Sequence, residues 1–168
     1  NVSSWVKSHA SVACGYATTH GVDRLLQMSA LGADPDAPTA SLRAKGLAEE
    51  VVRDSSLEWT IVRPSVVFGE GDEFVRFTKL VAPPYLTPLP GGGRTRFQPI
   101  HVDDLVAMLA DALGEAHVGE TYELCGPEKL TLADVARLIH RSEGRAANVV
   151  PVPMPLAKLG LAVFDRIP

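Results

Sequence analysis

The sequence predicts an α/β fold built on a doubly wound parallel sheet. Short β-rich runs, among them residues 24–29, 59–62 and 121–124, are separated by longer segments in which apolar residues recur with helical spacing. Such alternation is typical of βαβ units, whose strands run parallel and whose helices cover the sheet. With 168 residues, the chain is long enough for one domain with its own core. We therefore expect a Rossmann-like sheet, of which this chain forms the C-terminal portion together with a small substrate-side lobe.

The first predicted elements are a helix over residues 2–20 and a buried strand over residues 24–29. The helix carries small and apolar residues and ends near Gly21, a residue type that commonly follows helices. Residues 32–38 are dense in glycine, proline and aspartate, which indicates an irregular loop.

A second helix and a second strand follow this loop. Thr39 or Ser41 can cap the helix, which we expect to reach about Ser55 because its apolar residues keep helical spacing. The β-branched and aromatic residues at 59–62 predict the strand.

A proline-rich stretch divides the chain into two predicted parts. Residues 74–80 form a short helical candidate, four prolines interrupt residues 83–90, and three glycines that begin at Gly91 turn the chain. We expect residues 1–82 to hold the later strands and helices of the sheet domain. Residues 83–168 then form a smaller C-terminal lobe that completes the same domain.

The second part contains two further predicted helices. Residues 97–102 are extended, and Asp103 caps a helix that has Asp104 as an acid in its first turn. Thr131 caps another helix, which runs through His140. The tail from Val149 to Pro168 is proline-rich at first and then predicts an apolar helix over residues 155–167.

Composition excludes several kinds of protein. Sixteen basic and twenty acidic residues give a net charge of −4, which does not favour a nucleic-acid surface. Cys14 and Cys125 stand far apart without a metal-ligand motif, so we expect no metal and two buried thiols in a reducing, cytoplasmic setting. No run reaches the roughly 18 apolar residues of a membrane-spanning helix, which leaves peripheral membrane association as an alternative. Asn1 is not a natural start, so we expect the chain to be truncated, with its N-terminal segment missing.

No glycine fingerprint for a dinucleotide pyrophosphate is present. Gly69-Glu70-Gly71 is the nearest candidate, but Phe74 stands where a third glycine is needed and Glu70 would repel phosphate. If a dinucleotide binds, we expect its pyrophosphate cradle to come from upstream of Asn1. The present residues would then supply the nicotinamide side of the crevice, at the carboxyl ends of the later strands.

Four segments resemble a known family, and they are residues 29–34, 43–49, 59–69 and 92–104. They are similar to atypical short-chain dehydrogenase/reductase proteins of the NAD-dependent epimerase/dehydratase type. Within that family they most resemble the branch that contains the accessory subunit of NADH:ubiquinone oxidoreductase and its NADH dehydrogenase-like relatives. The resemblance covers about residues 21–155 and begins at the helix before the fifth strand of the family fold.

The resemblance implies NAD or NADP as cofactor and gives roles to particular residues. Lys45 would bind the ribose hydroxyls, because an ammonium group on a long stem can reach a diol. Ser29, at the end of a strand, would lie near the nicotinamide ring. The contacts along the ring and its carboxamide would come from Pro64, Ser65, Val66 and Val67.

Ser41 departs from the family pattern. Many members carry Tyr-x-x-x-Lys, in which the tyrosine gives up a proton as general acid–base catalysis requires. Here Lys45 is present, but Ser41 occupies the tyrosine position, and a serine hydroxyl is shorter and far less acidic. Tyr16, Tyr85 and Tyr122 lie elsewhere in the chain. No catalytic residue is therefore assigned.

Three arginines and one histidine leave alternatives open. Arg63 is either a charge for cofactor or substrate, or a structural arginine paired with an acid. Arg94 and Arg96, beside three glycines, are candidate contacts for an anionic substrate, with a solvated hairpin as the alternative. His101 is interpreted as structural, and the resemblance implies that it and Asp104 tie a strand to the following helix.

The leading hypothesis is an NAD(P)-binding protein of the accessory-subunit type without standard Tyr-Lys catalysis. The alternatives are an NAD(P)-dependent sugar-nucleotide epimerase or reductase, and a non-enzymatic assembly or interaction module. If the protein is an enzyme, we expect an oxidoreductase or an epimerase. The expected partners are the nicotinamide dinucleotide, a small-molecule substrate, and either a respiratory complex or a second copy of the chain.

Overall fold

The computed structural model describes residues 2–71, 87–146, 148–153 and 155. The chain forms two compact units, of which the first contains residues 1–65 and 100–125 and the second contains residues 66–99 and 126–168. It passes from one unit to the other after residues 65, 99 and 125. The boundary predicted at residues 82 and 83 lies outside the described residues, as do the helices predicted at 74–80 and over almost all of 155–167.

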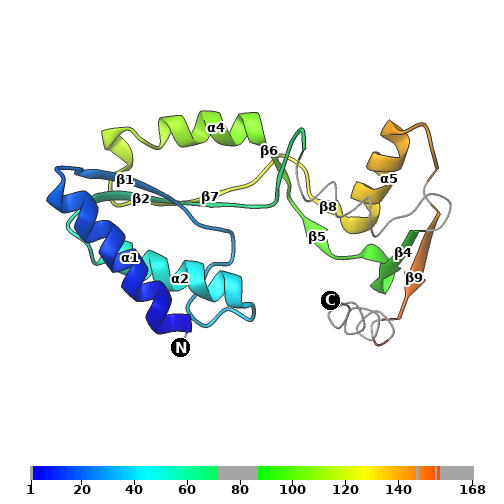
Figure 1. The fold of residues 1–168 in the computed structure, drawn as a ribbon. Helices are drawn as coiled ribbons and strands as arrows, with labels where there is room; N and C mark the ends of the chain where they lie inside the picture. Colours follow the sequence, from blue (N-terminus) through cyan, green and yellow to red (C-terminus); the bar gives the residue numbers. More distant parts are fainter. Residues whose placement is uncertain (1, 72–86, 147, 154, 156–168) are drawn as a thin grey trace. The chain divides into compact units, whose positions relative to one another are not determined.

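The first unit is built on a parallel sheet of three strands. These are β1 (Arg24–Met28), β2 (Glu58–Pro64) and β7 (Thr121–Leu124), in the order β1-β2-β7 (Figure 1). Leu26 pairs with Thr60 in the first ladder, and Val62 pairs with Tyr122 in the second. The three strands predicted from β-rich runs are confirmed, and so is their parallel direction.

Helices cover both faces of this sheet. Helices α1 (Val2–Thr19) and α2 (Ala40–Arg53) lie on one face, and α4 (Val102–Asp111) lies on the other (Figure 1). Ile61 and Val62 are adjacent in β2, so their side chains point to opposite faces of the sheet. Both are 0% exposed because helices cover both faces. The core under α1 and α2 gathers Cys14, Val52, Leu57 and Ile61.

The α2 helix is fixed to the loop that precedes it. Thr39, and not Ser41, is the N-cap, since its hydroxyl accepts a hydrogen bond from the Leu42 amide at 3.4 Å. The Arg43 guanidinium donates to the Ala37 carbonyl at 2.7 Å. Gly46 lies so close to the loop that an added Cβ would stand 2.3 Å from the carbonyl carbon of Asp34. The helix can approach the loop this closely only because position 46 has no side chain.

The second unit contains a parallel strand pair that the sequence did not predict. It joins β4 (Thr87–Pro90) to β9 (Val149–Val152), with Leu89 opposite Pro151. The prediction that this proline-rich stretch is only broken chain is wrong at β4, and the proline-rich start of the tail likewise contains β9. Prolines are tolerated because a strand in a two-stranded sheet has one edge where no ladder donor is needed.

Helix α5 (Leu132–Ser142) packs on this pair, and Ala133 and Ala136 contact Leu89 in a small core. Its predicted cap is confirmed as a full capping box. Thr131 Oγ1 accepts from the Asp134 amide at 3.1 Å, and Asp134 accepts from the Thr131 amide at 3.1 Å. The hydrogen bonds from Thr131 are the main reason why the pKa of Asp134 is lowered.

The cap of α4 differs from the prediction. The helix begins at Val102, and His101 is its N-cap, with Nδ1 accepting from the Asp103 amide at 3.3 Å. Asp103 and Asp104 both lie in the first turn, where the helix dipole favours acids. The structural interpretation of His101 is therefore confirmed, whereas Asp103 as the cap is wrong.

The remaining elements are short. They are β3 (Val67–Phe68), η1 (Gly91–Gly93), β5 (Arg96–Phe97), β6 (Ile100–His101), η2 (Glu115–His117) and β8 (Leu130–Thr131). Strand β5 pairs antiparallel with β8. Among the described residues, no helix combines the length and the apolar character that crossing a membrane requires.

We predict opposite effects for two glycine-to-alanine changes in helices. Gly46→Ala should lower the free energy of unfolding by about 1–3 kcal/mol, because the new methyl group meets backbone atoms that cannot move aside. Gly15→Ala in α1 is the matched control, since nothing lies within 4 Å of its added Cβ. It should raise stability by up to about 1 kcal/mol through helix propensity. Urea unfolding of both variants checks this, and equal effects would contradict the close approach at Gly46.

Candidate functional site

The carboxyl ends of the three parallel strands meet at one edge of the first unit. Beyond β1, the Ser29 amide donates to the Val62 carbonyl at 2.7 Å and the Leu31 amide donates to the Pro64 carbonyl at 2.9 Å. Beyond β2, the Ser65 amide donates to the Leu124 carbonyl at 2.8 Å. The structure therefore brings three of the predicted cofactor residues, Ser29, Pro64 and Ser65, to the edge where open α/β sheets bind ligands.

Along one stripe of side chains on α2, exposure to solvent decreases from the start of the helix toward its end. Ser41, Lys45 and Glu49 are spaced four residues apart, so they lie one above the other on the helix. Ser41 is exposed, Lys45 is half-buried and Glu49 is 0% exposed. Within the part of the chain that the structure describes, Lys45 makes no ion pair or side-chain hydrogen bond. Its ammonium group is therefore available to a ligand.

Two arginines compensate the buried carboxylate of Glu49. Arg63, in β2, binds it with both ends of its fork, Nε to Oε1 at 3.0 Å and Nη2 to Oε2 at 2.7 Å. Arg53, one turn along α2, donates to Oε2 at 2.9 Å. Bidentate pairs of this kind are among the strongest hydrogen bonds in proteins. Of the two interpretations of Arg63, the structure confirms the structural arginine paired with an acid.

These contacts determine the protonation of the pair. Burial alone would raise the pKa of Glu49, but the hydrogen bonds from Arg63, with smaller contributions from Ser29 and Arg53, lower it overall. The hydrogen bond to Glu49 in turn raises the pKa of Arg63. Both groups are therefore charged in the folded protein at neutral pH.

The hydroxyl group of Ser29 is buried and lacks an ordinary hydrogen bond among the described residues. It is 3% exposed, and its Oγ makes no hydrogen bond of ordinary geometry to a described residue, although it lies close enough to Glu49 to lower that pKa. A buried polar atom without a good partner costs about 1–3 kcal/mol. Its position beside the carboxyl edge of β1 and β2 fits a group that is partnered when a ligand is present.

The other predicted contacts belong to the second unit. Val66 and Val67 are half-buried, whereas Arg94 and Arg96 are exposed. Arg96 lies in β5, opposite Thr131 of β8. The roles of these residues toward cofactor or substrate stay predictions.

The described tyrosines do not replace Ser41. Tyr16 lies on the outer side of α1, stacked on His20 with ring centroids 3.9 Å apart. Tyr122 lies in β7, where its hydroxyl is 2.9 Å from His117 Nδ1. Tyr85 lies outside the described residues. The site thus has the lysine of the family motif without a described phenol near it.

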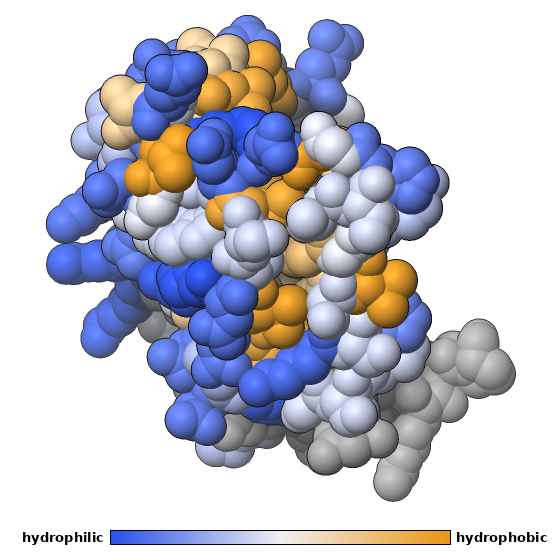
Figure 2. Space-filling model, turned by 90° about the vertical axis from the view of Figure 1, so that its left-hand side faces the viewer, coloured by the Kyte–Doolittle hydropathy of each residue, from blue (hydrophilic) through white to orange (hydrophobic). Residues whose placement is uncertain are grey.

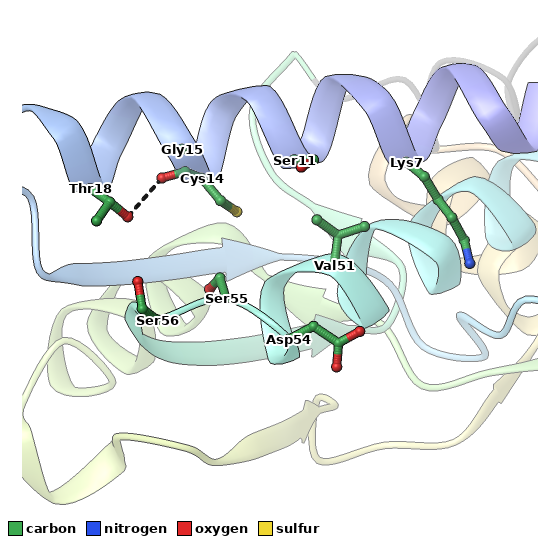
Figure 3. Close-up of a pocket in the computed structure, with 9 residues that line it drawn as sticks. All are labelled: Lys7, Ser11, Cys14, Gly15, Thr18, Val51, Asp54, Ser55 and Ser56. Carbon is green, nitrogen blue, oxygen red and sulfur yellow. Dashed lines mark hydrogen bonds between the residues drawn. The ribbon is translucent and has the colours of Figure 1, made fainter.

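A separate groove lies between α1 and the end of α2 (Figure 3). It has a volume of about 490 Å³, and several of its polar side chains bond within the protein. Thr18 donates to the Cys14 carbonyl at 3.0 Å, and Lys7 pairs with Glu50 at 2.9 Å. Burial raises the pKa of the Cys14 thiol, and a hydrogen bond with Ser55 opposes this. We therefore assign neither ligand nor nucleophile to this groove.

The cysteines and the acids show no metal chemistry among the described residues. Cys14 is buried, whereas Cys125 is half-buried and not fully buried as predicted, and both are free thiols. Searching the described residues finds no group of three or more histidine, cysteine, aspartate or glutamate side chains placed to hold a metal ion.

Glu49 is the buried residue of the candidate site that sequence reasoning missed. The sequence contained a signal for this residue, because an acid one turn after Lys45 falls among the apolar residues Leu47, Ala48 and Val52 of the same predicted helix. An acid in an apolar stripe requires a cationic partner, and Arg63 was the available arginine in the neighbouring strand.

Comparison with known proteins identifies the kind of domain. Residues 6–84 match the family described as NAD(P)H-binding. The chain is 37% identical over 148 residues to NADH dehydrogenase (ubiquinone) 1 alpha subcomplex subunit 9, mitochondrial, from Arabidopsis thaliana, covering 86% of this chain and 37% of that protein. It is 28% identical over 143 residues to the NAD(P)H azoreductase of Xenophilus azovorans, covering 84% of this chain and 49% of that protein.

A solved structure shows the same fold. It is the dTDP-glucose 4,6-dehydratase of Bacillus anthracis in complex with NAD, which superimposes with a TM-score of 0.70 at 17% identity. The match covers 86% of this chain and 54% of that one. The predicted Rossmann-like fold is therefore confirmed, and the match to the NAD(P)H-binding family agrees with the predicted resemblance and with NAD or NADP as the cofactor class. The chain spans less than half of the length of the Arabidopsis relative.

We predict a pH-dependent role for Glu49 in stability. Since its pKa is lowered in the folded state, its stabilising effect is present above the ordinary carboxyl range and is lost as the pH falls through the lowered pKa. At neutral pH, Glu49→Gln should lower the free energy of unfolding by about 3–5 kcal/mol, because two arginines lose a buried charged partner. The difference from the unchanged protein should shrink as the pH is lowered.

The matched control is the neighbouring residue, Glu50. Its pair with Lys7 is exposed, so Glu50→Gln should change stability by less than about 1 kcal/mol at any pH. Denaturant unfolding from about pH 7 to about pH 3 covers the ordinary carboxyl range. A Glu49→Gln effect that does not vary with pH would contradict the ionised pair.

Proposed function

On the premise that residues 6–84 belong to the NAD(P)H-binding family, we propose that this chain carries the nicotinamide end of a dinucleotide site in a protein of the NADH dehydrogenase accessory-subunit type. When bound, the nicotinamide group supplies the capacity for hydride transfer. The protein's own contribution is to hold and orient it, with Lys45 donating to the ribose hydroxyls.

The observation that carries this proposal is the stripe of α2. Half-buried Lys45, which has no ionic partner among the described residues, lies one turn before a buried ion pair. The carboxyl edge of the strands also holds the Ser29 hydroxyl, which makes no ordinary hydrogen bond to a described residue. An ammonium group and a hydroxyl at one strand edge suit the hydroxyls of a ribose. The same stripe argues against ordinary dehydrogenase chemistry, because Ser41 cannot supply the proton that a phenol would.

Association with other subunits belongs to the same proposal. Several large apolar side chains are exposed, and they include Trp5, Val12 and Tyr16 on the outer side of α1. On the face drawn in Figure 2, hydrophobic side chains form patches between hydrophilic ones. The Arabidopsis relative is named as a subunit, and burial of such patches would favour assembly. Cytoplasmic or membrane-peripheral location goes with this proposal.

A second candidate is a reductase that works without the tyrosine. It is favoured by the similarity to a relative named as an NAD(P)H azoreductase. In this case the proton would come from solvent or substrate, and reduced cofactor would be consumed. Sugar-nucleotide epimerase chemistry is supported by the fold alone, and an assembly module would bind no dinucleotide at all.

We predict that Lys45→Met weakens NADH binding by about 10-fold or more, since a hydrogen bond from a charged group is lost. Lys7→Met is the matched control, because Lys7 already pairs with Glu50 and is not a predicted cofactor contact, so the Kd of this variant should not change. Fluorescence titration of the full-length protein with NADH and with NADPH gives the Kd values. No binding of either dinucleotide at millimolar concentration would leave only the assembly module.

Turnover separates the two remaining candidates. If the protein only binds the dinucleotide, NADH absorbance should stay constant with quinone or azo acceptors present. Steady oxidation that survives Ser41→Ala would support the reductase without tyrosine. If Ser41→Ala abolished oxidation, the serine would be catalytic. That result would contradict both the protein that only binds the dinucleotide and the reductase proposed here.

A further inference from the structure

A small cavity lies on the face of the sheet opposite to α1 and α2. It has a volume of about 140 Å³, is bordered by α4, β2, β7 and the short helix η2, and is partly open to solvent, since Met108 in its lining is 42% exposed. Its apolar lining consists of Val62, Met108, Ala112 and Leu124. A closed apolar cavity of about 150 Å³ accepts benzene, so this partly open pocket has room for a molecule of that size.

One end of this cavity is polar. The Tyr122 hydroxyl is 2.9 Å from His117 Nδ1, and His117 Nε2 is 3.5 Å from Asp111 Oδ2. The two rings meet edge to face, with centroids 5.5 Å apart. All three side chains line the cavity, so a series of polar contacts runs from its wall to the exposed carboxylate of Asp111.

His117 is held in place by a buried network. The hydroxyl of Thr60, which is 0% exposed, donates to the His117 carbonyl. Arg24 donates to Thr60 Oγ1 at 2.6 Å and to the Ala112 carbonyl at 2.7 Å. This network joins β1, β2 and the end of α4 behind the cavity. The polar end is therefore preorganised, which reduces the entropy that a ligand must lose on binding.

The chain of contacts determines which hydrogen-bonding group remains free. A carboxylate facing Nε2 favours the proton on that nitrogen, which leaves Nδ1 as an acceptor. The Tyr122 hydroxyl then donates to Nδ1. Its oxygen lone pairs remain as acceptors, so the polar end of the cavity is complementary to a donor.

We propose that this cavity binds a small neutral molecule with an apolar body and a single hydroxyl or N–H donor, of the size of phenol, whose donor bonds to the Tyr122 oxygen. The site is separate from the carboxyl edge that is assigned to the dinucleotide. Binding here requires neither Lys45 nor Ser29.

Three probes of similar size test the proposal. Phenol has a donor, anisole has only an acceptor and toluene has neither. Phenol should bind about threefold to tenfold more tightly than anisole or toluene, as expected for one net hydrogen bond. Titrations of the purified protein followed by ¹H–¹⁵N NMR shifts measure the three affinities and show where each probe binds.

Matched variants test whether the preference for phenol arises at the cavity. Tyr122→Phe should abolish the preference for phenol, whereas Tyr16→Phe, at an exposed position of α1, should leave it unchanged. Met108→Trp fills the cavity and should remove binding of all three probes. If this variant fails to fold, Tyr122→Phe alone still decides the question.

Equal affinity for the three probes, or a phenol preference that survives Tyr122→Phe, would overturn the proposal. So would the absence of saturable phenol binding. NADH titration of Tyr122→Phe runs in parallel and should match the unchanged protein. In the unchanged protein, absence of phenol binding together with NADH binding would contradict this inference alone, and absence of NADH binding together with phenol binding would contradict the proposed function alone.

Discussion

The buried ion pair between Glu49 and Arg63 is the constraint on which the arrangement of the first unit depends. It joins the middle of α2 to the end of β2 through two hydrogen bonds, with Arg53 completing the set. A helix that turned about its axis or shifted by a residue would leave charges buried without partners, at a cost of several kcal/mol. The orientation of α2 is therefore fixed, and Lys45 and Ser41 are presented as a consequence.

Strand β2 is the element that both candidate sites share. Its residue Ile61 packs under α1 and α2, whereas Val62 faces α4 and the small cavity. At its end, Pro64 and Ser65 bond to the neighbouring chain segments at the carboxyl edge. One strand, buried on both faces, thus supports the proposed dinucleotide site at its end and the proposed apolar site on one of its faces.

Local signals predicted much of the fold. The cap at Thr131 and the β-rich run of β2 are encoded within a few residues and were predicted from them, whereas the full capping box with Asp134 was seen only in the structure. Strand β4 was not predicted, because Pro88 and Pro90 normally interrupt a strand. Only the pairing with β9, from the distant tail, shows that this segment forms one. Whether these residues form a strand therefore depends on tertiary contacts and not on the local sequence.

The candidate site was predictable in part for the same reason. Ser29, Pro64 and Ser65 follow strands, so their meeting at one edge could be inferred from parallel order alone. The bidentate pairing of Arg63 depends on the rotation of α2 against β2, and no local pattern specifies that rotation. The cavity beside Tyr122 depends on three elements that are separate in the sequence, so it could be seen only in the fold.

The interleaving of the two units has a consequence for how the chain folds. Strands β1 and β2, with α2 between them, come from one continuous stretch, so their ladder closes a short loop. Strand β7 joins the same sheet only after residues 66–99 have left the unit and the chain has returned. Its docking requires closure of a much longer loop, which costs more chain entropy and slows folding. Assembly of the β1–α2–β2 unit should therefore precede the addition of β7 and α4.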